Sequence, residues 1–180
     1  MHDHAVELPR FPRLPALALR GLPLAPLSLT LSAFARRMAT RHPSMFRRLG
    51  DHAKARFVLD PTDLPICMAL EPAEGRPRVQ LSRAPLEGDA RIAGPLAALL
   101  GMVHGAYDGD ALFFSRDLVI EGDTAAVLAL RNAMDNAELD LAAEAEAISG
   151  PLGARVRRLI DFAERRTGVA LSRQEDMYEW

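Results

Sequence analysis

Apolar residues recur at helical spacing along much of the chain. Leu96, Leu99, Leu100 and Val103 follow an i, i+3, i+4, i+7 pattern, which predicts a helix that Gly94-Pro95 opens. Similar spacing predicts further helices over residues 28–41, 45–54, 124–138, 142–148 and 154–166. The hydroxyl residues at positions 28, 30 and 32 are candidate N-caps for the first of these, and Ser44 for the second. His42-Pro43 is expected to end the first helix, because the residue before a proline avoids the helical conformation.

A different pattern, typical of β-strands, occurs in several segments between residues 56 and 121. Val79-Gln80-Leu81-Ser82 alternates apolar and polar residues, as a half-buried strand does. Further strands are predicted at residues 56–59, in the apolar run 65–70 and at residues 118–121. Residues 90–93 are expected to form an edge strand. Gly122 predicts a tight turn, and Asp123 the N-cap of the helix that follows it.

The N-terminal residues differ in composition from the rest. Residues 1–26 are rich in proline and expected to be extended, and leucine recurs from Leu14 to Leu31. Residues 1–60 carry ten Lys and Arg against four Asp and Glu, while the rest of the chain carries twelve against twenty. Such an arm can lie on a membrane, with its leucines inserted and its arginines on anionic headgroups, or it can cover an apolar opening of its own domain.

The length of 180 residues, 49% hydrophobic and 26% charged, fits one soluble globular domain with appended segments. We divide the chain into a basic arm with its helix (1–43), a central domain (44–141) and a C-terminal amphipathic helix with a tail (142–180). The uncharged run over residues 21–35 is interrupted by two prolines and is too short to span a bilayer. No signal peptide is recognised, so we expect a cytoplasmic protein with peripheral contact at the inner membrane.

Catalytic signatures are missing from the sequence. There is no nucleophile elbow, phosphate-binding loop, dinucleotide fingerprint or His-Glu-x-x-His motif. The single cysteine, Cys67, lies between apolar residues and is interpreted as a buried, inert thiol, which excludes a cysteine-based metal site. An aromatic content of 6% and an acidic body argue against nucleic-acid binding. We therefore expect no catalytic residue, no metal and no cofactor.

The apolar residues of the second half can line a cavity for an acyl or prenyl chain, or simply fill a core. Leucine and methionine adapt well to flexible chains. The candidate lipid-binding residues are Leu96, Leu99, Leu100, Val103, Phe113, Phe114, Leu118, Ile120, Leu128 and Met134. Arg116 and Arg131 can face lipid headgroups or pair with Asp117 and Asp135.

One motif is specific enough to carry a resemblance. Residues 112–124 read Leu-Phe-Phe-x-Arg-x-Leu-x-Ile-Glu-Gly-Asp-Thr, and residues 130–135 continue as Leu-Arg-Asn-Ala-Met-Asp. This pattern resembles the sterol carrier protein type 2-like family and, within it, the UbiT family of accessory factors in oxygen-independent ubiquinone biosynthesis. The resemblance extends over about residues 20–140 and includes the leader with Ser32-Ala33-Phe34-Ala35-Arg36-Arg37.

The resemblance implies an α+β fold, in which a twisted, mainly antiparallel sheet and helices on one side enclose an apolar tunnel. It implies a non-catalytic protein that binds a prenylated quinone precursor or a phospholipid. It also implies iron–sulfur hydroxylases similar to UbiU and UbiV as partners, which would hold any cluster themselves. Two alternatives stay open: a general phospholipid or sterol-type carrier, and a protein scaffold whose packed core holds no ligand.

Overall fold

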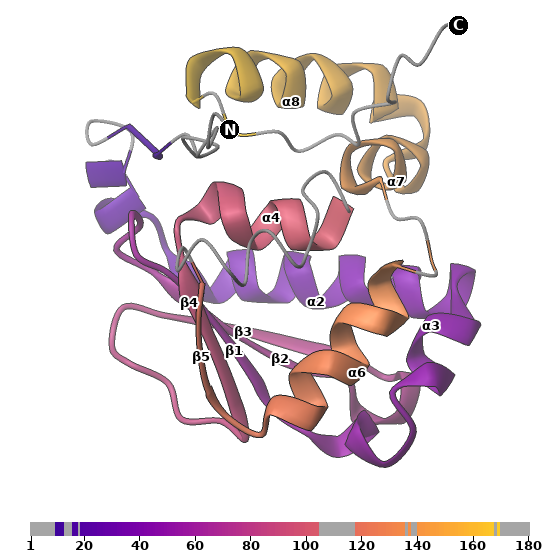
Figure 1. Ribbon diagram of the computed structural model, residues 1–180. Coiled ribbons are helices and arrows are strands. Elements are labelled where there is room, and N and C mark those ends of the chain that lie inside the picture. Colours follow the sequence, from indigo (N-terminus) through magenta and orange to yellow (C-terminus); the bar gives the residue numbers. More distant parts are fainter. Residues whose placement is uncertain are drawn as a thin grey trace, which may run out of the picture.

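A mixed five-stranded sheet with helices over one face forms the body of the protein (Figure 1). The computed structural model describes residues 10–12, 16–17, 19–104, 118–135, 137, 140–167 and 169. The strands are β1 (Phe57–Pro61), β2 (Cys67–Glu71), β3 (Arg78–Ser82), β4 (Ala90–Gly94) and β5 (Val119–Gly122). The helices are α2 (Leu24–Arg41), α3 (Pro43–Arg48), α4 (Leu96–His104), α6 (Thr124–Asp135), α7 (Leu141–Ile148) and α8 (Gly153–Thr167). Short 3-10 turns are η1 (Leu19–Gly21), η2 (Gly50–Lys54), η3 (Ala73–Gly75) and η4 (Gly150–Leu152).

The strands lie in the order β3-β2-β1-β4-β5. All neighbours are antiparallel except β1 and β4, which run parallel. This confirms the α+β fold with a mainly antiparallel sheet. The helices form two layers on one side: α2, α4 and α6 lie nearest to the sheet, and α7 and α8 stack beyond α4 (Figure 1).

The placement of residues 90–93 at a sheet edge was wrong. β4 lies inside the sheet between β1 and β5, where Ala90 and Ile92 are completely buried. The one charged residue of this strand, Arg91, projects to the open face and bonds there to Asp60 and Glu121. These two carboxylates allow a charged residue in a central strand, because they satisfy its guanidinium group.

Helix α2 begins four residues earlier than predicted, so residues 24–26 are helical and not extended. Its N-cap is Pro23, which makes no side-chain bond, and the predicted serine caps serve another purpose. Ser28 Oγ accepts the N–H of Leu81 at 3.0 Å. Ser32 Oγ accepts the N–H of Val79 at 2.9 Å and donates to its carbonyl at 3.1 Å. The two serines thus satisfy backbone groups along the outer edge of β3, where a further strand would otherwise pair.

The single helix predicted over residues 45–54 is divided. The helix α3 ends at Arg48, and the turn η2 begins at Gly50, whose φ of +52° is incompatible with a continuous α-helix. His42 precedes Pro43 as the N-cap, without a side-chain bond, so the expected cap at Ser44 was wrong.

The turn between β5 and α6 confirms the roles predicted for Gly122 and Asp123. Gly122 has a φ of +82°, which favours glycine. Asp123 donates its N–H to the carbonyl of Asp89 at 2.8 Å, and its Oδ1 accepts the N–H of Ala126 at 3.0 Å. The chain is thereby tied to the start of β4 and the first turn of α6 is capped.

Cys67 is buried at the start of β2, as the sequence indicates. Its Sγ lies 3.0 Å from the carbonyl oxygen of Ala84, to which it donates. Burial, and secondly the negative charge of Asp60, raise the pKa of this thiol above its ordinary value of 9.0.

We expect the Cys67 thiol of the native protein to react with an aromatic disulfide reagent at least about tenfold more slowly at pH 8 than in urea, because both access and thiolate content are reduced. The folded protein binds this proton more tightly than the unfolded chain, so the contribution of the thiol to stability is lost as the pH rises above about 9. Equal reaction rates with and without urea would contradict the buried position.

Candidate functional site

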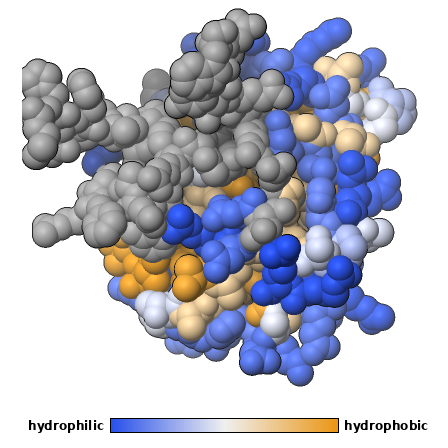
Figure 2. All heavy atoms as spheres, turned by 45° about the vertical axis from the view of Figure 1, so that its right-hand side comes forward, coloured by the Kyte–Doolittle hydropathy of each residue, from blue (hydrophilic) through white to orange (hydrophobic). Residues whose placement is uncertain are grey.

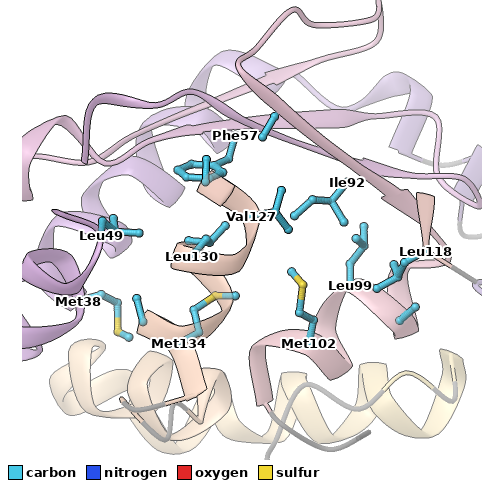
Figure 3. Close-up of a cluster of buried hydrophobic side chains, with 14 residues drawn as sticks. Met38, Leu49, Phe57, Ile92, Leu99, Met102, Leu118, Val127, Leu130 and Met134 are labelled. Atoms are coloured by element: carbon cyan, nitrogen blue, oxygen red, sulfur yellow. The ribbon is translucent and has the colours of Figure 1, made fainter. Parts of the chain in front are cut away.

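An apolar cluster fills the space between the sheet and the helices (Figure 3). Its buried members come from β1, β4, α2, α4 and α6 and from the residues that flank α3 and β5. They are Met38, Leu49, Phe57, Ala90, Ile92, Ala98, Leu99, Met102, Leu118, Ala126, Val127, Leu130, Ala133 and Met134. Segments far apart in the sequence therefore share one hydrophobic interior.

Two carboxylates position the helices that bound the cluster. Asp63, in the loop after β1, accepts the N–H of Leu96 at 2.9 Å on Oδ1 and the N–H of Phe11 at 2.8 Å on Oδ2. Asp123 caps α6 in the same way. A carboxylate at a helix N-terminus stabilises the unpaired N–H groups and the helix dipole, so both helices begin at defined points beside β4 and β5.

The cluster changes in character from the sheet outwards. Phe57, Val127 and Ile92 lie nearest to the sheet, and Met38, Met102 and Met134 lie on the side of α7 and α8 (Figure 3). Methionine has three rotatable bonds and a polarizable sulfur, so it accommodates partners of irregular shape. The side of the cluster that faces α7 is thus the more adaptable one.

Helix α7 is fastened over this side by a charged contact. Glu144 Oε1 lies 2.9 Å from Nε2 of His42, and Glu144 Oε2 lies 2.8 Å from Nε of Arg41. Ile148 at the end of α7 packs against the cluster. The end of α2 and the helix α7 are therefore joined next to the methionine side chains.

The chemistry of the cluster is uniform. Among the described residues Ser32 is the one polar residue classed as buried, and its hydroxyl is engaged by Val79. No group of three or more His, Cys, Asp or Glu that can hold a metal ion comes together in the described ranges. Such an interior offers a ligand apolar contact and little else.

The structure brings many of the sequence-predicted lipid-binding residues together. Leu99, Leu118 and Met134 are buried members of the cluster, and Val103 and Ile120 pack against it. Leu96 and Leu100 are half-buried. Phe113 and Phe114 lie outside the described residues, together with Arg116. These positions do not by themselves test which residues contact a lipid.

Leu128 differs from the others. Its side chain is 55% exposed on α6, so it does not belong to the buried face of that helix. The buried face of α6 consists of Ala126, Val127, Leu130, Ala133 and Met134, which follow helical spacing. Arg131, on the same side, places Nε 3.5 Å from Oδ2 of Asp135, which is the second of the two predicted roles.

Apart from its alanines, seven buried members of the cluster were absent from the predicted lipid-binding set: Met38, Leu49, Phe57, Ile92, Met102, Val127 and Leu130. Phe57 and Ile92 lie in predicted strands, whose alternation identifies the buried face only after strand pairing is known. Met38 and Leu49 come before the first strand in sequence and reach the cluster through long-range packing. Met102, Val127 and Leu130 carried a local signal, since they accompany predicted apolar stripes.

The outer surface gives less direct information. Figure 2 shows one side of the molecule, on which hydrophobic side chains gather at one place within a mainly hydrophilic surface. Within the described part of the chain no helix is both long and apolar enough to cross a membrane.

Similar folds occur in solved structures. One described as "UbiJ-SCP2 Ubiquinone synthesis protein" has a TM-score of 0.52 and 17% identity, over 65% of this chain and 96% of that chain. A crystal structure of sterol carrier protein 2 has a TM-score of 0.45 and 15% identity, over 59% and 92% of the two chains. Sterol carrier protein 2 from Yarrowia lipolytica, in its apo form, has the same TM-score and identity over 62% and 92%. At these identities the likeness is one of fold.

The sequence itself identifies the family. No curated protein matches the chain. Residues 34–135, more than half of the 180, match the SCP-2 sterol transfer family. The matched range contains all five strands together with α3, α4 and α6, which bound the apolar cluster. The chain belongs to the SCP-2 sterol transfer family.

Proposed function

We propose that this protein is a non-catalytic lipid-binding accessory factor. It binds a prenylated ubiquinone precursor or a phospholipid and presents it to oxygen-independent hydroxylases of ubiquinone biosynthesis. The observation that supports this proposal is the apolar, methionine-containing cluster between the sheet and α4, α6 and α7, in a chain of the SCP-2 sterol transfer family. The lipid-binding unit of the proposal is residues 44–141, with Met38 of α2 added to its interior.

The chemistry of the cluster favours a lipid tail over a polar substrate. Burial of apolar surface stabilises a complex by roughly 25 cal/mol per Å², so a prenyl or acyl chain gains affinity without polar partners. The adaptable side chains of Met102 and Met134 can move apart for such a chain more readily than branched residues can. The cluster offers no acid, base or nucleophile within the described residues, which supports a carrier over an enzyme.

The proposed role in ubiquinone biosynthesis is based on the residues that resemble the UbiT family. The motif over residues 112–124 and its continuation at 130–135 are the specific part of that resemblance. A protein of similar fold is described as a ubiquinone synthesis protein. On this proposal the partners are iron–sulfur hydroxylases similar to UbiU and UbiV, which receive the ring of the precursor while the tail stays in the carrier.

Peripheral contact with a membrane through the N-terminal arm is also part of the proposal. Leu24, Leu27 and Leu31 are half-buried on the side of α2 that packs on its own sheet. Leu17, Leu22 and Leu29 are exposed, with Leu29 at 72%. These outward leucines, together with Arg20, are the part of the arm that can meet lipid.

The test is organic extraction of the purified protein followed by mass spectrometry, with a mock purification alongside. We expect a prenylated phenol or quinone in near-stoichiometric amount. Phospholipid alone would favour a general lipid carrier. Absence of any lipid from protein prepared without detergent would contradict the proposal and favour a scaffold with a packed core.

A set of methionine variants locates the lipid. Met102→Asn places an amide in the cluster and is expected to reduce the extracted lipid at least about tenfold, because the amide must be desolvated. Met102→Leu preserves the volume and should retain the lipid. Met68→Asn, on β2 outside the cluster, is the matched control. Equal loss of lipid in both asparagine variants would place the ligand elsewhere.

A further inference from the structure

The outer face of α8 combines positive charge with exposed apolar side chains. Leu159 is 68% exposed and Phe162 is 54% exposed. Four arginines of this helix are also exposed: Arg155, Arg158, Arg165 and Arg166. At 3.6 residues per turn, Phe162 and Leu159 point in the same general direction as these arginines, which flank Phe162 on both sides. Leu152, which is 53% exposed, precedes the helix.

The acidic residues of α8 lie on its other side. Asp161 and Glu164 are half-buried, and Oδ1 of Asp161 lies 3.1 Å from Nε of Arg157. The one arginine that faces inwards is therefore paired along the helix. The exposed face keeps its positive charge, and Arg166 places its guanidinium 5.8 Å from the ring centre of Phe162.

The position of α8 in the fold leaves this face outermost. The helix packs against α7 and the turn η4, on the far side of α4 from the sheet (Figure 1). Its start lies close to α7: a Cβ added at Gly153 would lie only 2.7 Å from the carbonyl oxygen of Glu146. The absence of a side chain at Gly153 therefore permits this close approach. A surface that binds this face is therefore brought next to the layer that covers the methionine side of the cluster.

We propose that the outer face of α8 docks the protein on an anionic lipid surface. Arginine side chains can extend their charged ends to phosphate groups while their aliphatic stems lie along apolar surface. Leu159 and Phe162 then enter the boundary between headgroups and acyl chains, as the apolar residues of an interfacial helix do. This surface is separate from the N-terminal arm, and the inference does not depend on the identity of the cargo.

A lipid surface fits this face better than a polyanion such as RNA. Phosphates of either kind attract the arginines. Exposed aliphatic side chains such as Leu152 and Leu159 gain nothing from a nucleic-acid backbone, whereas they gain free energy on transfer from water to an acyl layer. The only aromatic side chain of the face, Phe162, already has a guanidinium over its ring.

The experiment measures flotation of the full chain with vesicles. The vesicles contain phosphatidylcholine alone or equal parts of phosphatidylcholine and phosphatidylglycerol. We expect at least about tenfold tighter binding to the anionic vesicles, with binding weakened by salt, because the basic residues near such a surface are attracted to its negative charge and salt screens that attraction. Two double variants test the face: Arg155→Gln with Arg158→Gln, and Leu159→Ser with Phe162→Ser. Each is expected to weaken binding about tenfold or more.

Matched controls separate this face from general effects of charge or hydrophobicity. Arg157→Gln removes an arginine from the inner side of the same helix. Val119→Ser removes an exposed apolar residue from β5. Both controls are expected to bind like the unchanged protein. The substituted outer residues are exposed, so all variants should fold, which circular dichroism and urea denaturation check.

Unchanged vesicle binding in both double variants would overturn the proposal, as would loss of binding only on Leu29→Ser in the arm. Binding of a single-stranded RNA oligonucleotide through the same arginines, without vesicle binding, would also overturn it. Lipid extraction from the same variants separates the two proposals. Variants that lose vesicle binding but keep their extracted lipid support the docking role of α8. If the unchanged protein binds vesicles but yields no lipid, the proposed carrier function is contradicted and the docking proposal is not.

Discussion

Gly122→Ala is expected to lower the free energy of unfolding by about 2–5 kcal/mol. Two effects combine at this position. The φ of +82° is unfavourable for a residue with a Cβ, and that Cβ would lie 2.3 Å from the carbonyl oxygen of Asp89. The obstacle is backbone, which cannot swing aside as a flexible side chain can. The shift of the urea midpoint, at unchanged slope, measures the loss.

Gly75→Ala is the matched control for this substitution. Gly75 has a φ of +90°, and an added Cβ there would meet no atom within 4 Å. Only the backbone conformation is penalised, by about 1–2 kcal/mol. If the two variants are equally destabilised, the close approach of β5 to Asp89 does not contribute, and the tight turn is less constrained than the structure indicates.

Ser32→Ala is expected to lower the free energy of unfolding by about 2–4 kcal/mol, since removal of one hydroxyl leaves the N–H and the carbonyl of Val79 without that partner. The residue is only 8% exposed, so water has little access to replace the hydroxyl. The higher helix propensity of alanine offsets a small part of this destabilisation. Urea denaturation measures the total effect, and hydrogen exchange at the Val79 amide shows whether it arises at β3.

Thr30→Ala gives the comparison within the same helix. The hydroxyl of Thr30 is exposed and donates only to the carbonyl of Pro26 in its own helix. A surface substitution of this kind changes stability by about 0.5 kcal/mol or less. Comparable effects of the two substitutions would mean that the serine contacts with β3 are dispensable.

Local signals predicted most of the elements. The helices α4, α6, α7 and α8 and the turn at Gly122-Asp123 follow from apolar periodicity and capping residues, which act within a few positions of each other. The element boundaries that failed depend on other interactions. Helix α2 extends to Leu24 because its inner side packs on β3, and the helix after Pro43 is divided by the left-handed conformation of Gly50.

The pattern of hydrophobic and polar residues does not predict contacts between residues that are far apart in the sequence. The segment at residues 90–93 contains an arginine and reads as an edge, and only the carboxylates of Asp60 and Glu121 explain its central place. Asp63 caps α4 from 33 positions away, which no capping motif records. For the candidate site, periodicity selected Leu99 and Met134, which are buried, but also Leu128, whose side chain is 55% exposed. Its contacts with lipid remain a prediction.

The two serines of α2, Ser28 and Ser32, lie outside the part of the chain that matches the family. The match to the family begins at residue 34, within α2 and after both Ser28 and Ser32. A fragment cut at that boundary would leave the outer edge of β3 with unpaired backbone groups, a template for pairing with a second copy. The range that matches the family is therefore shorter than the unit that satisfies the outer edge of its own sheet. In this chain the leader completes the sheet without being a strand of it.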